Sequence, residues 1–302
     1  MRPLLPLLLA APLLLAQAPP PSLANTSADQ IIAAAPASAW ISINPDDIMV
    51  MDTAVGQMII QLAPEFAPAH VAAIKALVKA GRFDDGRIVR VQDNYVVQWV
   101  ARPPAGKEPL SQPPDVREQR VRPDPLPAEY ERSSKGLNFT KSPFKDSYAK
   151  AGWVNGWQAA RDRKAGTLWL AHCYGTVGVG RDMPPDTGDG AELYTVIGHG
   201  PRHLDRNIAN VGRVLAGIEP HAALPRGTEA LGFYKDEGQR VKITRVRLAS
   251  QIPGFARWQM MDTASASFAQ VVQARANRTG FFVRQAGAAD LCTLKVPVRE
   301  AA

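Results

Sequence analysis

The sequence lacks the short motifs that mark most nucleophilic, nucleotide-binding and metal-dependent enzymes. Its 302 residues contain no Gly-x-Ser-x-Gly nucleophile elbow, no P-loop and no dinucleotide-binding fingerprint. Of the five histidines, His199 and His203 have the spacing of metal ligands on a helix. The residues between and beside them, Gly198, Gly200 and Pro201, disfavour a helix. We therefore predict a protein that uses neither a metal nor a cofactor.

Cysteine is also scarce, since Cys173 and Cys292 are the only two. Two cysteines in an oxidising compartment can form a disulfide. The sequence does not show whether these two lie close enough to do so. A disulfide and two free thiols are therefore equally open at this point.

Long hydrophobic runs are absent after residue 24. The first 24 residues contain one basic residue, Arg2, a leucine-rich core from Leu7 to Ala16, and Ser22-Leu23-Ala24 as a small-x-small cleavage site. The core is shorter than the ~20 apolar residues that a membrane span needs. We predict that residues 1–24 are a signal peptide, with an uncleaved anchor as the alternative. We expect an exported protein, in the periplasm or else secreted, with no membrane span after signal removal.

The net charge of +7 does not indicate a nucleic-acid partner. The basic residues are scattered and often stand next to acids, as in Arg161-Asp162-Arg163. No basic stripe alternates with aromatic residues, which is the pattern typical of nucleic-acid surfaces. We interpret the charge as favouring solubility.

The remaining chain divides by composition. Residues 25–46 are rich in Ala, Pro and Ser and are predicted to be a tether. Residues 48–53 and 57–62 predict a hairpin, and Ala69–Ala80 predicts a helix that ends at Gly81. Residues 101–165 are rich in proline and predict a long loop. Residues 251–302 form a carboxy-terminal extension, for which we expect a helix from Phe268 to Arg275 and strands around Phe281 and Leu294.

The segment from Arg87 to Val100 predicts two strands joined at Asp93-Asn94. Strict alternation places Ile88, Arg90 and Gln92 on one face. Arg90 is thus a cation among valines, and Gln98 is an amide among Val96, Val97 and Trp99. On spacing alone, an arginine of this kind is usually a solvated residue on a sheet face.

The spacing Arg90-x-x-x-x-Tyr95-Val96-x-Gln98, after a helix and a glycine-containing turn, resembles the active-site segment of cyclophilins. In these peptidyl-prolyl isomerases the segment reads approximately Phe-His-Arg-Val-Ile-x-x-Phe-Met-x-Gln-Gly-Gly. Arg90, Tyr95, Val96 and Gln98 match its arginine, phenylalanine, methionine and glutamine. The first aromatic residue and the histidine are replaced here by Ile88 and Val89.

Three later segments extend the resemblance. The strand at 166–171 resembles the family's Gly-x-x-x-Met-Ala, which would make Ala171 a pocket residue and place His172 where the family has asparagine. The strand at 190–197 resembles Gly-Ser-Gln-Phe-Phe-Ile, with Tyr194 at the phenylalanine that floors the proline pocket. His203-Leu204-Asp205 resembles Trp-Leu-Asp, so His203 replaces a tryptophan, and Ile208 replaces a histidine further on.

The resemblance covers residues 47–248 and implies a mostly β fold. We expect a cyclophilin-like eight-stranded antiparallel barrel over 47–250, interrupted by the loop at 101–165. Two helices should cap it, the second of them over residues 217–224. The resemblance implies cis/trans isomerisation of X-Pro bonds in unfolded or exported polypeptides, with Arg90 as the catalytic donor and Gln98 orienting it. The implied substrate-binding residues are Tyr95, Val96, Ala171, His172, Tyr194, His203 and Leu204. Two alternatives remain open: a non-catalytic proline-peptide binding module or chaperone on the same fold, and a structural protein that uses the proline-rich loop.

Overall fold

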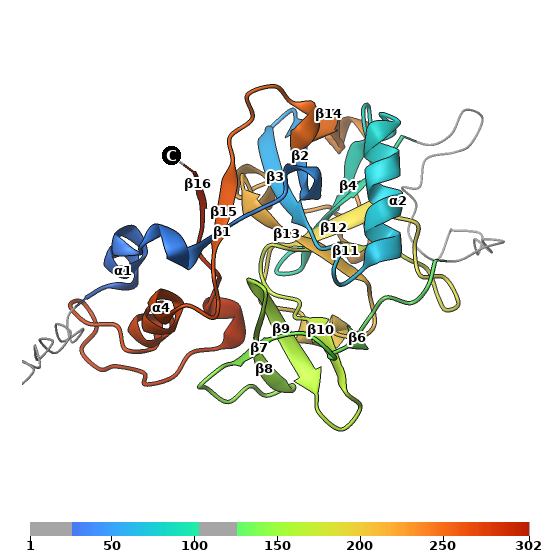
Figure 1. Ribbon diagram of the computed structural model, residues 1–302. Coiled ribbons are helices and arrows are strands. Elements are labelled where there is room, and N and C mark those ends of the chain that lie inside the picture. Colours follow the sequence, from blue (N-terminus) through green and yellow to red (C-terminus); the bar gives the residue numbers. More distant parts are fainter. Residues whose placement is uncertain (1–25, 103–125, 302) are drawn as a thin grey trace, which may run out of the picture.

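The computed structural model describes residues 26–102 and 126–301 (Figure 1). The predicted signal peptide lies outside the described residues, as do the prolines between 103 and 125. Among the described residues, no helix is both long enough and apolar enough to cross a membrane.

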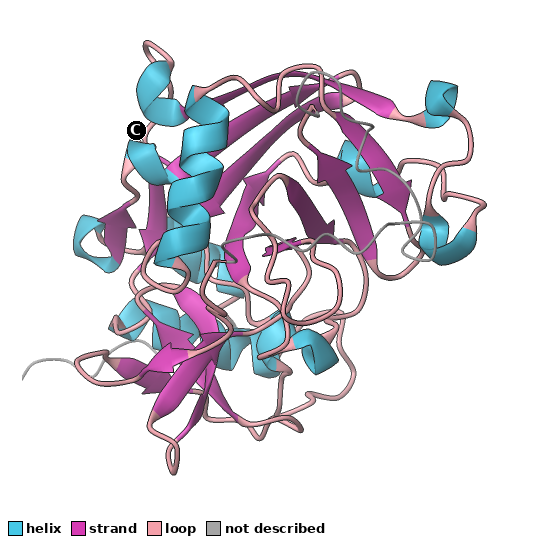
Figure 2. Cartoon of the chain, turned by 90° about the vertical axis from the view of Figure 1, so that its right-hand side faces the viewer, coloured by secondary structure: helices cyan, strands magenta, loops and turns pink. Residues whose placement is uncertain are grey.

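Eight antiparallel strands close into a barrel in the order β11-β12-β5-β4-β14-β2-β3-β13, which confirms the predicted fold class (Figure 2). Its interior is filled by fully buried side chains such as Met49, Ile60 and Trp99. Alternation along the strands gives each one an apolar inner face, and burial of those faces stabilises the closed sheet. The strands are β2 (Ile48–Thr53), β3 (Gly56–Leu62), β4 (Arg87–Val91), β5 (Val96–Val100), β11 (Thr176–Val179), β12 (Glu192–Val196), β13 (Asn210–Ala216) and β14 (Val241–Leu248).

Two helices belong to the barrel. Helix α2 (Pro68–Lys79) begins with a proline, whose missing N–H is not needed at that position, and buries Val71, Ile74 and Val78 in the barrel core. Helix α3 (Glu219–Ala222) is shorter than the predicted 217–224. Pro225 restricts the residue before it to extended conformations, which explains the early end.

A second sheet occupies much of the segment predicted to be a loop. Strands β6 (Arg132–Ser133), β7 (Phe139–Lys141), β8 (Lys150–Val154), β9 (Trp157–Asp162) and β10 (Thr167–Leu170) pair in the order β6-β10-β9-β8-β7. The loop prediction is therefore wrong from Arg132 onward. Asn155 and Gly156, both with positive φ, form the tight turn between β8 and β9. An Asn-Gly pair is a strong hairpin signal, and the loop prediction, which rests on the prolines, takes no account of it.

The two ends of the described chain meet in a third sheet. Strands β1 (Trp40–Ser42), β15 (Trp258–Met261) and β16 (Val298–Glu300) pair in the order β1-β15-β16. Helix α1 (Ala28–Ala34), capped by Ser27 and Gln30, lies beside α4 (Ala266–Ala276), at the lower left of Figure 1. The tether prediction for 25–46 is therefore wrong, because apolar residues such as Ile31 and Trp40 bury against the C-terminal segment. The predicted helix at 268–275 is confirmed. The expected strands around Phe281 and Leu294 do not form.

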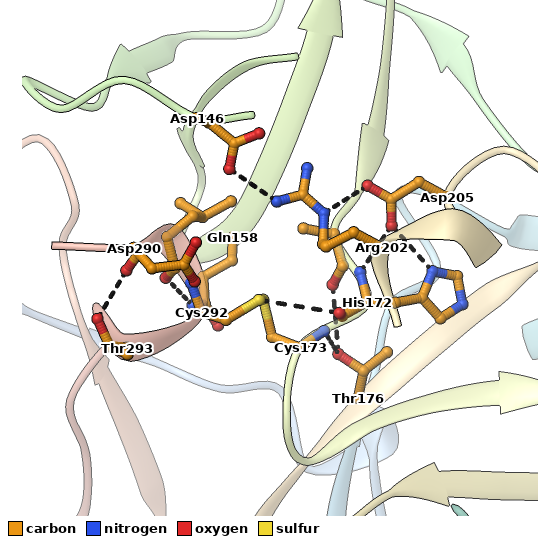
Figure 3. The surroundings of a disulfide bond; sticks show 12 residues. Asp146, Gln158, His172, Cys173, Thr176, Arg202, Asp205, Asp290, Cys292 and Thr293 are labelled. Atoms are coloured by element: carbon orange, nitrogen blue, oxygen red, sulfur yellow. Dashed lines mark hydrogen bonds and ion pairs between the residues drawn. A yellow bond between two sulfur atoms is a disulfide. The ribbon is translucent and has the colours of Figure 1, made fainter. Parts of the chain in front are cut away.

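A disulfide joins Cys173 to Cys292, across 119 residues of sequence, with their Cα atoms 5.0 Å apart (Figure 3). It links the segment between β10 and β11 to the C-terminal extension. The question that the sequence left open is thus answered by the approach of two segments that are distant along the chain.

Candidate functional site

A β-bulge decides where Arg90 points. In the β4–β5 register Ile88 pairs with Trp99 and Arg90 pairs with Gln98, so Val89 is the extra residue. The bulge leaves Ile88 and Val91 in the barrel core and turns Arg90 to the outer surface. The prediction that Ile88 and Arg90 share one face is therefore wrong, because the inserted residue breaks the alternation.

The Arg90 guanidinium is held by acceptors and rings around it. Its Nη1 donates to Oε1 of Gln98 at 2.9 Å, its Nε donates to the Leu231 carbonyl at 2.6 Å, and its Nη2 donates to Oε1 of Gln92. Its Cζ lies 5.5 Å from the ring centroid of Tyr95 and 5.4 Å from that of Phe233. A planar cation fixed in this way is preorganised, unlike a solvated strand arginine.

Gln98 connects Arg90 to the next strand. It is buried on the outer face of β5 and pairs with Tyr194 of β12. Its carbonyl accepts from Arg90, and its amide donates to Oε1 of Glu192. With both ends bonded, the amide has one orientation, and Arg90, Gln98 and Tyr194 form a row across three strands.

An apolar patch lies beside this row. It consists of buried Val96, Tyr194 and Val196, with the partly buried Tyr95, Leu204 and Ile208 packed against them. His203 lies at its edge, exposed, with its ring stacked on that of Tyr95 at a centroid distance of 6.4 Å. Four of the predicted substrate-binding residues, Tyr95, Val96, Tyr194 and Leu204, thus come together in one patch.

His172 lies beneath this patch and is fully buried. Its Nε2 is 3.1 Å from the Tyr194 hydroxyl, and its Nδ1 is 3.1 Å from Oδ1 of Asp205. The structure thus places His172 against the Tyr194 side chain with no exposed surface of its own, and its predicted contact with substrate stays a prediction. Burial raises the pKa of Tyr194, so its hydroxyl stays protonated.

Comparison with known proteins identifies the family to which this chain belongs. The family model described as cyclophilin type peptidyl-prolyl cis-trans isomerase/CLD matches residues 48–248, about two thirds of the chain. The chain belongs to this cyclophilin family. A search of curated proteins finds no match.

One solved structure supports the fold, and a second is reported beside it for comparison alone. A cyclophilin from Hirschia baltica, AquaCyp293, is similar with a TM-score of 0.64 at 20% identity, over 91% of this chain and 98% of that one. A cyclophilin type peptidyl-prolyl cis-trans isomerase of Cryptosporidium parvum, determined in the presence of the dipeptide Ala-Pro, gives a TM-score of 0.39 at 11% identity. That alignment covers 67% of this chain and 98% of the other.

Ala171 is not part of the cyclophilin site. It follows β10 in the second sheet and packs with Trp153 and Cys173. The barrel strand is instead β11, whose segment Gly175-Thr-Val-Gly-Val-Gly180 has the same Gly-x-x-x-apolar-small spacing nine residues later. Gly178 pairs with Tyr194, and a Cβ on it would lie 2.3 Å from the Tyr194 hydroxyl. Only glycine therefore lets the tyrosine ring lie across β11.

Sequence reasoning missed the residues that reach Arg90 from the loop before β14. Phe233 and the Leu231 carbonyl are more than 140 residues from Arg90 along the chain. Leu231 has a φ of 58°, which is strained for a branched side chain and turns its carbonyl toward Arg90. No local motif marks this loop, so only the tertiary structure identifies it.

A second missed set is the buried charge network under His172. Arg202 donates from Nε to Oδ2 of Asp205 at 2.7 Å and from Nη1 to Oδ2 of Asp146 at 2.8 Å. Burial alone would raise the pKa of Asp205, but the hydrogen bond from His172 and the charge of Arg202 outweigh it and lower that pKa. Asp205 therefore stays ionised. Within residues 26–102 and 126–301, no three His, Cys, Asp or Glu side chains are placed to hold a metal ion.

Proposed function

We propose that this cyclophilin isomerises X-Pro bonds of exported polypeptides, with Arg90 stabilising the transition state. The observation that carries the proposal is the Arg90 guanidinium, fixed by Gln98 at 2.9 Å beside the apolar patch. A proline ring against Val96, Tyr194 and Leu204 would bring its amide next to this fixed cation.

The chemistry requires a donor and no nucleophile. Amide resonance sets a barrier of ~18–20 kcal/mol to rotation about the X-Pro bond. As the bond twists, resonance is lost and a lone pair localises on the proline nitrogen. A guanidinium N–H aimed at that nitrogen interacts more strongly in the twisted state than in either planar state, which lowers the barrier. Gln98 keeps the donor in place, so little reorganisation accompanies the reaction.

The disulfide supports an exported setting. Disulfides persist in oxidising compartments and are rare in the cytosol, and Cys173–Cys292 joins two packed segments. In such a compartment X-Pro isomerisation takes tens of seconds without a catalyst. The clients would be unfolded, proline-containing chains.

The test is isomerase activity on Ala-X-Pro-Phe peptides, measured by protease-coupled or NMR exchange assay. We expect Arg90→Ala to lower kcat/KM by about 10²–10³, the loss seen when one preorganised donor is removed, with little change in melting temperature. Gln98→Ala should give a smaller loss. Arg245→Ala is the matched control, because Arg245 is a half-exposed barrel arginine paired with Asp52. Unchanged activity in Arg90→Ala would exclude the catalytic role.

A non-catalytic binding module is the second candidate. It is favoured by His203 and Ile208, which stand at or beside the apolar patch where the family has tryptophan and histidine. It predicts a wild-type protein that binds proline peptides without accelerating their isomerisation. The same peptides, tested for binding by fluorescence polarisation, separate the two functions.

A further inference from the structure

Tyr194, which forms the floor of the apolar patch, carries a hydroxyl that an apolar site does not need. Tyr194 extends across β11, over Gly178, and its hydroxyl is the group that meets His172. The phenylalanine of the family pattern has no such group, so this contact depends on the tyrosine present here. A buried tyrosine hydroxyl requires a partner, and the partner determines where the ring rests.

We infer that His172 is a positioning residue that fixes Tyr194, and through it the surface that receives the proline ring. The inference rests on the proposed function, because it concerns the same site.

The hydrogen bonds run in one direction. The ionised Asp205 can only accept, so Nδ1 of His172 carries the hydrogen and donates to Oδ1. With that hydrogen on Nδ1, the lone pair of Nε2 faces the Tyr194 hydroxyl, which lies 3.1 Å away and is assigned as the donor. This assignment of the hydrogens follows from the partners. His172 thereby joins the tyrosine to a carboxylate that cannot rotate away.

Asp205 is held by three further donors. The backbone N–H of His172 donates to Oδ1 at 2.9 Å, and Nε1 of Trp169 donates to Oδ2 at 3.2 Å. Arg202 completes the set and reaches Asp146 in the β7–β8 loop of the second sheet, called the inserted sheet below (Figure 3). Because the Asp205 carboxylate accepts from four donors, it has one arrangement, and so does the His172 ring bonded to it.

The same network also positions Leu204, a second residue of the apolar patch. Arg202 and Asp205 flank His203 and Leu204 in one short 3₁₀ turn. Leu204 packs against the patch that contains Tyr194. The Asp205 carboxylate therefore fixes the distance between two parts of the patch. It holds the Tyr194 ring through His172, and it holds Leu204 because both lie in the same short turn. The surface that receives proline is set by residues that never touch it.

The test is a double-mutant cycle on Tyr194 and His172, read as KM and kcat for a proline peptide. Tyr194 contacts the proline ring of the substrate whether the X-Pro bond is planar or twisted. Displacing Tyr194 therefore weakens binding of the ground state and of the transition state equally. We expect Tyr194→Phe to raise KM by about three- to tenfold, the range for one net hydrogen bond, with kcat unchanged. His172→Leu should raise KM by a similar factor alone and should add nothing in the Tyr194→Phe background.

The matched control is Tyr234→Phe. Tyr234 is also buried, and its hydroxyl donates to the Pro225 carbonyl at 2.6 Å, away from the patch. It should lower the melting temperature like Tyr194→Phe without changing KM. The inference is overturned if Tyr194→Phe leaves KM unchanged, or if the effect of His172→Leu persists undiminished in the Tyr194→Phe background. Tyr194→Phe is conservative, so it remains decisive if His172→Leu does not fold.

Failure of the proposed function is recognised separately. A wild-type protein that binds proline peptides without isomerising them excludes catalysis, and the dissociation constant then replaces KM in the same cycle. A wild-type protein that does neither overturns both proposals.

Discussion

The barrel wall and the junction beneath it hold their charges in different ways. We define the junction as the contact between the barrel, the inserted sheet and the C-terminal extension, with Asp146, His172, Arg202 and Asp205 at its centre. On the barrel wall, the paired side chains of Arg247 and Asp84 are 33% and 26% exposed. In the junction, the side chains that pair with Arg202 are 3% and 6% exposed.

The difference shows two means of stabilisation. The barrel is closed by strand pairing around an apolar core, so its ion pairs are additions at the surface. The junction joins segments that no continuous sheet connects, and it relies on a buried cation between two carboxylates and on a disulfide. Buried charges cost desolvation energy, so each depends on its partners. Loss of one charged partner should therefore lower the free energy of unfolding strongly in the junction and only slightly on the barrel wall.

The largest effect is expected from Arg202→Met. It leaves the carboxylates of Asp146 and Asp205 buried without their cation, and such a break costs about 3–5 kcal/mol of unfolding free energy. The control is Arg247→Met on the barrel wall, for which we expect about 0–1 kcal/mol. Urea unfolding of both variants measures the contrast. Equal losses would show that the two regions do not differ.

Removal of the disulfide should come next. Cys173→Ala combined with Cys292→Ala should lower stability by about 2–4 kcal/mol. Because the bridge connects the C-terminal extension to the barrel, hydrogen exchange should accelerate in β15 and α4 before it does in β4 and β5. A uniform acceleration across the barrel strands would contradict this division of the molecule.

The smallest effects should appear on acidification, in two pH windows. Burial lowers the pKa of His221 at the barrel end, and the pKa of Asp205 in the junction is also lowered, because its hydrogen bonds and Arg202 outweigh burial. For both groups the unfolded chain binds the proton more tightly, so stability falls as pH falls. The His221 contribution is lost as pH drops below about 6.5, and that of Asp205 only below about 3.9.

Melting curves from pH 7.5 to 3 separate these windows. His221→Gln should remove the first decline. Asp205→Asn also breaks the junction, so its curve should start at a lower melting temperature and lack the second decline. A first decline that persists in His221→Gln would assign it to another group.

The contact between Arg90 and Gln98 was implied by the family resemblance, and it is a local one. The two residues are eight positions apart across one tight turn, and strand pairing brings them together. Helix α2 and the hairpin of β2 and β3 are equally local, since period, proline and glycine signals act over a few residues. The order of these elements also carried the family resemblance, and with it the barrel.

Other features depended on which distant segments meet. Both Ala171 and Gly180 end a strand with the same spacing, and pairing with β12 and β13 decided that the second belongs to the barrel. The composition of residues 25–46 predicts a tether, and only the pairing of Trp40 with β15 shows that this segment is packed. The bulge at Val89 depends on the register between β4 and β5, and the alternation of residues along one strand does not reveal that register.

The sequence by itself determined the local elements, their order and the arginine that the family resemblance singles out, because these depend on interactions between near neighbours. Only the tertiary structure decided that His172 lies under Tyr194, that Leu231 and Phe233 reach Arg90, and that Cys173 meets Cys292. Each of these contacts except the first joins segments more than 100 residues apart. Such contacts form only when packing of the whole chain offsets the entropy of closing long loops.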